Sequence, residues 1–193
     1  MISDMEYRSN RGLEVRCPSN QPTELVGYAS TFNQPYEVDG VIETISEGAF
    51  DNTLKGSPDV FALVSHDPSR VIARSKNGTL KLMSDATGLK VNIKPVNTQE
   101  GRDLVTLIET GTIDAMSFGF IVKKDDLVMR DGRVHRAITE VELHEVSCVA
   151  FPANNQAVIS VRSRERANFL LHPHKKLIRR FIINPLATFQ RNK

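Results

Sequence analysis

Short segments in which apolar and polar residues alternate, separated by turn signals, constrain the fold more than any other feature of this sequence. Alternation with a period of two is the pattern of a strand with one buried face. The turns contain glycine, as in "KNG" and "DATG", and Asp131-Gly132 is a strong hairpin signal. The expected strands are residues 24–32, 59–66, 70–75, 79–84, 88–94, 115–124, 127–138, 140–151 and 157–161. We therefore expect a mostly antiparallel β-domain arranged as a meander or barrel.

Two helices interrupt this series of strands. Each begins at a side chain suited to an N-cap and ends at a glycine. They are residues 46–56, from Ser46 to Gly56 with Phe50 and Leu54 four apart, and residues 98–111, from Thr98 to Gly111 with Leu104, Leu107 and Ile108 on the buried stripe. The expected fold class is α+β: mostly β with helices, as an antiparallel β-barrel flanked by helices.

The charge distribution divides the chain into a body and a tail. Of the 25 basic and 23 acidic residues, nine basic and one acidic residue lie in residues 162–193, which leaves 16 basic and 22 acidic residues before them. Such asymmetry marks either a functionally separate tail or a solvated flexible end. We expect an irregular segment at residues 1–22, one folded domain at residues 23–161 and a basic tail at residues 162–193.

Composition argues against several classes of protein. Two cysteines far apart in a chain of 193 residues indicate a reducing compartment rather than a disulfide scaffold. No apolar run approaches the roughly 20 residues of a membrane span, and the first ten residues lack the apolar core of a signal peptide. The absence of tryptophan and the 6% aromatic content disfavour a nucleic-acid binder that works by stacking. His172 and His174 alone are a weak metal signal.

Ser117, within the stretch "DAMSFGF", is the candidate nucleophile. Alternation places Met116, Phe118 and Phe120 on a core face. Ser117 and Gly119 share the other face, where a glycine leaves room for another backbone, such as a peptide substrate. On this pattern alone, Ser117 is either a nucleophile or an ordinary strand serine beside a bulge.

A serine nucleophile requires a base within hydrogen-bonding distance, and His66 is the best candidate. His66 follows an apolar run and precedes "DPSR", so we expect it at the end of a strand, where sites are often built. A surface histidine before a turn would give the same pattern. Asp67 is a weaker candidate for the residue that orients the base, because adjacent strand residues point apart.

Glu145 is the candidate for the residue that orients the base. In "LHEVSCVAFPAN", alternation places Glu145 on one face with Leu143 and Ser147, while His144 points to the opposite face. A carboxylate on an otherwise apolar face needs a partner, because burying it unpaired is costly. That partner is either a histidine N–H or, in a structural ion pair, an arginine.

Six stretches, in their order and spacing, resemble the prohead (capsid maturation) proteases of tailed bacteriophages. They are "GYASTFNQPYE", "ISEGAFDNTL", "VSHDPSRVIAR", "GLKVNIK", "IDAMSFGFIV" and "VELHEVSCVAFPANNQAV", and they cover about residues 24–161. The resemblance implies a fold similar to that of the herpesvirus assembly proteases, which is a β-barrel with helices packed around it.

The resemblance also implies a catalytic triad. His66 of "SHDP" would be the base, Ser117 of "MSFGF" the nucleophile and Glu145 of "HEVS" the third member. Because the herpesvirus enzymes use a second histidine as the third member, His144 is the alternative there. Ser117 would attack a peptide carbonyl while His66 takes its proton. Backbone donors in residues 151–156 are expected to form the oxyanion hole, and no metal or organic cofactor is expected.

The family implies a serine endopeptidase that acts inside the procapsid, in the host cytoplasm, on segments of the major capsid protein or scaffold. Self-cleavage and possible self-association are further expectations, whereas membrane and nucleic-acid partners are not expected. The basic tail would be a removable targeting segment for an acidic capsid surface, or a short amphipathic helix that binds a partner. The alternative function is a non-catalytic capsid-associated or scaffold protein that retains the barrel, with His66 and Ser117 too far apart to interact.

Overall fold

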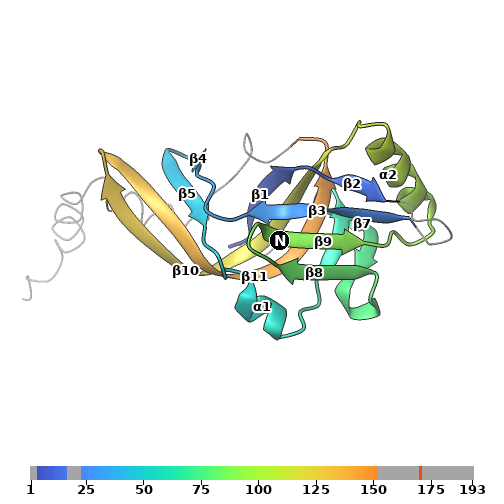
Figure 1. Cartoon of the computed structure of the whole chain (residues 1–193), viewed down its shortest axis with the longest axis horizontal. Coiled ribbons are helices and arrows are strands. Elements are labelled where there is room, and N and C mark those ends of the chain that lie inside the picture. Colours follow the sequence, from blue (N-terminus) through green and yellow to red (C-terminus); the bar gives the residue numbers. More distant parts are fainter. Residues whose placement is uncertain (1–3, 17–22, 152–169, 171–193) are drawn as a thin grey trace, which may run out of the picture.

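The computed structural model describes residues 4–16, 23–151 and 170, and it contains two β-sheets and two α-helices (Figure 1). The elements are β1 (Glu6–Arg11), β2 (Glu14–Arg16), β3 (Glu24–Thr31), β4 (Tyr36–Val38), β5 (Val41–Ile45), α1 (Asp51–Lys55), β6 (Phe61–Val64), β7 (Asp67–Arg74), the 3₁₀ turn η1 (Ser75–Asn77), β8 (Leu80–Ser84), β9 (Gly88–Ile93), α2 (Gln99–Glu109), β10 (Ala115–Arg130) and β11 (Arg133–Val149). The expected class, mostly β with two helices, is confirmed.

The strands form two sheets, which together contain both parallel and antiparallel pairs, and not the antiparallel barrel that was expected. One has seven strands, in the order β1-β10-β11-β5-β4 with β6 on β11 and β7 on β6, and the other has the order β2-β3-β9-β8. β5 and β6 follow each other along one edge of β11, and both pair with it in parallel. Across the described ranges the two sheets do not close into a barrel. Alternation reports which face of a strand is buried, but it carries no information on the direction of its neighbour.

A long hairpin of β10 and β11 lies at the centre of the larger sheet, and other strands pair along both of its sides (Figure 1). Its turn is Asp131-Gly132, as predicted, and both residues have the positive φ angles that a tight hairpin turn requires. Residues 115–130 and 133–149 are each one continuous strand, where the sequence suggested three shorter ones. The far end of the hairpin, with β4 and β5 beside it, extends away from the four-stranded sheet (Figure 1).

The main core lies on the predicted face of β10. Met116, Phe118 and Phe120 are almost completely buried and belong to one cluster with residues of both sheets, such as Leu25 and Leu89 of the smaller one. The rings of Phe118 and Phe120 stack with their centroids 4.8 Å apart. This core face of β10 leaves Ser117 on the other side of the sheet, as alternation requires.

The helices agree with the sequence in part. Thr98 caps α2 as predicted, with its hydroxyl accepting a hydrogen bond from the Gly101 N–H at 3.2 Å. Leu104 and Ile108 are buried against the core, whereas Leu107, also expected there, is 36% exposed. The first helix is shorter than predicted.

Two predictions need correction: the start of the first helix and the structure of residues 1–22. Residues 47–50 form turns, so that α1 begins after Phe50 and Ser46 is not its N-cap. Phe50 occupies the N-cap position without a side-chain hydrogen bond to the helix, and it is completely buried in the core. Within residues 1–22, which were expected to be irregular, residues 6–11 and 14–16 form strands β1 and β2.

Charged side chains occupy the buried positions of β1. Glu6 and Arg8 are at most 2% exposed and meet Glu43 of β5 and Arg136 of β11. Arg136 Nη1 lies 2.8 Å from Glu6 Oε2, and Arg8 Nη2 lies 2.9 Å from Glu43 Oε2. A search for apolar alternation cannot detect a strand whose inward residues are an ion-pair network.

Candidate active site

Ser117 and Glu145 lie on the face of the larger sheet opposite the core. Ser117 of β10 is directly opposite Ser9 of β1 and Ser147 of β11. In the next row, Gly119 of β10 is opposite Glu145. Because directly opposed residues point to the same side of a sheet, these side chains share one polar face, on which Ser117 and Ser147 are completely buried.

A β-bulge at His144 gives Glu145 its orientation. The register of β10 and β11 shifts here, and His144 is the extra residue on β11. Leu143 and Val146 both point into the core, which strict alternation would not allow. The prediction that Glu145 shares an apolar face with Leu143 is therefore wrong, since the bulge turns Glu145 to the polar face.

His66 and Glu145 are in direct contact. His66 Nδ1 lies 2.8 Å from Glu145 Oε1, with the histidine side chain 25% exposed and the carboxylate 10% exposed. A carboxylate accepts hydrogen bonds, so Nδ1 donates and Nε2 is left to accept a proton. This is the arrangement in which a carboxylate sets the tautomer of a general base.

The turn that carries His66 is strained. Val64 and Asp67 pair across it, and its two central residues, Ser65 and His66, have φ angles of 53° and 61°. Side chains other than glycine rarely adopt this region, at a cost of about 1–3 kcal/mol each. Hydrogen bonds to β11 offset the strain, since Ser65 N–H donates to the Cys148 carbonyl and His66 N–H donates to Ser147 Oγ.

The Ser117 hydroxyl is directed toward β1. It donates a hydrogen bond to the Arg8 carbonyl at 2.8 Å, and the residue is completely buried. The structure therefore brings His66 and Glu145 together and places Ser117 on their face, but in this conformation the hydroxyl donates to β1 and not to His66.

Gly119 makes room for other side chains of the site. A Cβ atom at Gly119 would lie 2.5 Å from Glu145 Oε1 and 3.0 Å from Cε1 of Tyr7. The Tyr7 ring in turn meets the His66 ring edge-on, with centroids 4.4 Å apart. Burial, together with the Glu145 charge, raises the pKa of the Tyr7 hydroxyl. The space expected for a substrate beside Ser117 is occupied by Glu145 and Tyr7.

The other candidate residues lie apart from this contact. His144 Nε2 lies 3.3 Å from Glu142 Oε1. The Asp67 carboxylate accepts from the backbone and hydroxyl of Ser69, and these bonds lower the pKa of Asp67. The expected oxyanion loop beyond Phe151, the strand 157–161 and the histidines of the tail lie outside the described residues.

Sequence reasoning missed two residues of the site. Tyr7 lies in the segment that was expected to be irregular, so no strand pattern indicated it. Ser147 was placed on the face of Glu145, but a serine two residues away gave no sign of a role. The shared face of Glu145 and Ser147 could at most have suggested that the two side chains are neighbours; the hydrogen bond between them is visible only in the structure.

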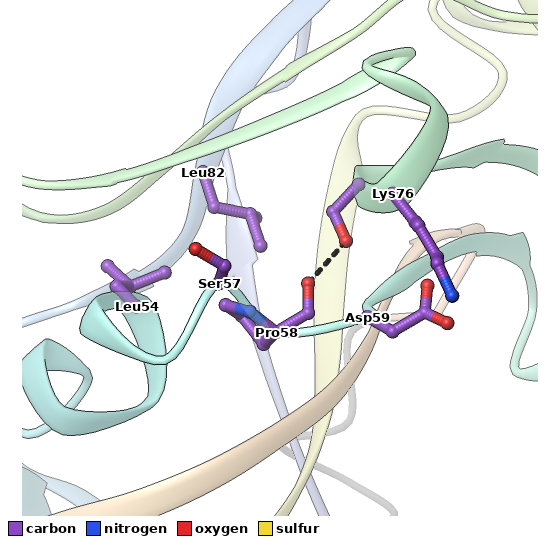
Figure 2. A pocket seen from close by; sticks show the side chains of 7 residues that line it. Leu54, Ser57, Pro58, Asp59, Lys76 and Leu82 are labelled. Carbon is purple, nitrogen blue, oxygen red and sulfur yellow. Dashed lines mark hydrogen bonds between the residues drawn. The ribbon is translucent and has the colours of Figure 1, made fainter.

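A hollow of about 500 Å³ lies elsewhere in the fold (Figure 2). It is lined by Leu54, Ser57, Pro58, Asp59, Ser75, Lys76 and Leu82. The Ser75 hydroxyl donates to the Pro58 carbonyl at its edge, at 2.6 Å. None of these residues contributes to the His66–Glu145 pair, so the hollow is not part of this site.

The described residues contain neither a membrane-spanning helix nor a cluster of metal-binding side chains. None of the helices in residues 4–16, 23–151 and 170 is both long enough and apolar enough to span a membrane. Within the same ranges, no three His, Cys, Asp or Glu residues are grouped as a metal site would require.

The described residues thus hold a histidine in contact with a carboxylate, and a serine on the same sheet face, which are the residue types of sites where a base activates a nucleophile. The sequence profile described as Caudovirus prohead serine protease matches residues 11–171. The chain belongs to this family.

Two proteins illustrate the similarity. The prohead protease of Enterobacteria phage HK97 is 35% identical over 136 residues, which cover 69% of this chain and 57% of that protein. The chain thus spans less than two thirds of that relative. The structure of the bacteriophage T4 capsid assembly protease, gp21, matches with a TM-score of 0.55 at 10% identity, over 77% of this chain and 98% of that chain. At this identity the similarity concerns the fold.

Proposed function

We propose that this chain is a serine endopeptidase that cleaves segments of capsid or scaffold protein, and also itself, inside the procapsid in the host cytoplasm. Membership of the prohead protease family supports the substrate class and the location. The contact of 2.8 Å between His66 Nδ1 and Glu145 Oε1 carries the proposal, because it is what a general base needs to be held in one tautomer.

In the proposed reaction His66 Nε2 accepts the proton of the Ser117 hydroxyl, and the hydroxyl oxygen attacks the peptide carbonyl. His66 then donates that proton to the leaving amine, and water releases the acyl group by the reverse sequence. Glu145 keeps Nδ1 protonated and stabilises the imidazolium through the direct contact.

Catalysis requires a change at Ser117. Its hydroxyl must turn from the Arg8 carbonyl toward His66, and the residue must be uncovered for a substrate to reach it. Catalytic hydrogen bonds are often long or misaligned before the substrate binds, so the observed bond is compatible with this role.

Glu145 is the better candidate than His144 for the third member. Glu145 contacts the His66 ring, whereas His144 is the bulged residue and lies next to Glu142. We therefore expect His144→Ala to leave cleavage almost unchanged and Glu145→Gln to reduce kcat by roughly 10⁴-fold.

The test is co-expression of the chain with the capsid precursor of the same phage, followed by gel analysis of cleavage. Ser117→Ala and His66→Ala should each abolish visible cleavage, with losses of roughly 10⁶-fold in kcat. Ser30→Ala, at a buried strand serine of the other sheet, is the matched control and should cleave normally. Cleavage by folded Ser117→Ala would refute Ser117 as the nucleophile, whereas absence of cleavage by the unmodified chain would favour a non-catalytic capsid-associated protein.

A further inference from the structure

We propose that Ser147 is a positioning residue that holds His66 and Glu145 together, an inference that rests on the proposed function. Ser147 is completely buried on β11, two residues from Glu145 and directly opposite Ser117. Its hydroxyl makes hydrogen bonds to both members of the His66–Glu145 pair.

The first bond fixes the carboxylate. Ser147 Oγ donates to Glu145 Oε2 at 2.5 Å, while Oε1 accepts from His66 Nδ1 at 2.8 Å. Each carboxylate oxygen thus has its own donor, and rotation of the group would break one bond or the other. Short O–H···O⁻ bonds of this kind are among the stronger hydrogen bonds in proteins.

The second bond fixes the backbone that carries the base. The same oxygen accepts the His66 N–H at 3.1 Å. His66 occupies a strained turn with a φ angle of 61°, and such conformations persist only where surrounding contacts determine them. One hydroxyl therefore links the backbone of the base to the carboxylate that orients its ring.

Replacing Ser147 by alanine would remove both bonds at once. Glu145 Oε2 would lose its donor, and the His66 N–H would lose its acceptor, so the strained turn would be held less firmly. Partners that orient the ligands of metal sites contribute about 10- to 100-fold to activity, and we expect an effect of the same order for Ser147. A loss in kcat with little change in KM is expected, because Ser147 does not need to touch the substrate.

The experiment measures phosphonylation of Ser117 by a fluorophosphonate probe, in which the serine oxygen bonds to phosphorus and fluoride leaves, so that no identified substrate is needed. Ser147→Ala should react about 10- to 100-fold more slowly than the unmodified chain. Ser147→Thr keeps a hydroxyl and should recover most of the rate. Ser30→Ala, also a buried strand serine, should react at the original rate. The downfield proton resonance of His66 Nδ1–H should shift or disappear in Ser147→Ala only.

Each outcome decides the proposal. A Ser147→Ala rate within about twofold of the original, or an unchanged His66 resonance, would overturn it. A folded Ser147→Thr variant as slow as Ser147→Ala would also overturn it, because the hydroxyl would then be irrelevant. If either variant fails to unfold cooperatively, Ser147→Cys, which keeps the volume but donates weakly, is measured by the same criteria. If Ser117→Ala is labelled as fast as the original chain, the proposed function itself fails, and this result is distinct from a failure at Ser147.

Discussion

Gly119→Ala tests the geometry of the site with a single carbon atom. The new Cβ would lie 2.5 Å from Glu145 Oε1, and ordinary contact begins near 3.4 Å, so the carboxylate must retreat by about 0.9 Å. A retreat of that size would lengthen the 2.8 Å bond to His66 Nδ1 to as much as about 3.7 Å, beyond hydrogen-bonding range. Misplacement on this scale costs about 100-fold in rate.

The assay for this variant is steady-state cleavage of a peptide that spans a capsid-precursor junction. We expect kcat to fall about 100-fold with the free energy of unfolding reduced by only about 1–3 kcal/mol, measured in urea. Gly56→Ala is the control, because Gly56 has a φ angle of −75° and its added Cβ would find its nearest neighbour at 3.4 Å. Its kcat should not change.

Two results would refute the reasoning. Unchanged kcat in Gly119→Ala would mean that the carboxylate position is unimportant or that Glu145 moves without loss. A raised KM with unchanged kcat would instead support the prediction made from the sequence, that Gly119 leaves room for the substrate.

Two further predictions concern buried groups away from the catalytic contact. Glu43→Ala leaves the two arginines of the buried network without one carboxylate and should cost about 3–5 kcal/mol in urea unfolding. Glu37→Ala, at an exposed ion pair, should cost less than about 1 kcal/mol, and equal losses would contradict this account. Burial raises the pKa of the Cys148 thiol to about 12, so at pH 8 Cys148 should resist a thiol reagent in the native protein and react in urea, as peptide mapping can check. Fast native labelling at Cys148 would show that β11 opens readily.

Local patterns in the sequence predicted the parts of the fold that depend on neighbours along the chain. The core face of Met116, Phe118 and Phe120, the Asp131-Gly132 turn and the Thr98 cap are all confirmed. Each depends on residues within a few positions of one another. The same patterns missed β1, because its inward side chains are charged and pair with Glu43 and Arg136, which lie far along the chain.

The candidate site, too, was predicted from the sequence only in part. Residue types and motif resemblance were enough to nominate Ser117, His66 and Glu145 from the sequence. They did not reveal that Ser147 bridges the last two, because that bridge depends on the position of the β6–β7 turn beside β11.

By itself, the sequence determined the mostly β character of the domain, the buried face of β10 and the identity of the candidate residues, but it did not show β1, β2, β4 or β5. The tertiary structure decided the direction in which Glu145 points, what occupies the space at Gly119 and where the Ser117 hydroxyl donates its hydrogen bond. For Glu145 the physical reason is the bulge at His144, whereas the Ser117 hydrogen bond depends on the pairing of β10 with β1. Alternation assumes an unbroken register, and one extra residue, set by pairing with β10, reverses which face every later side chain occupies.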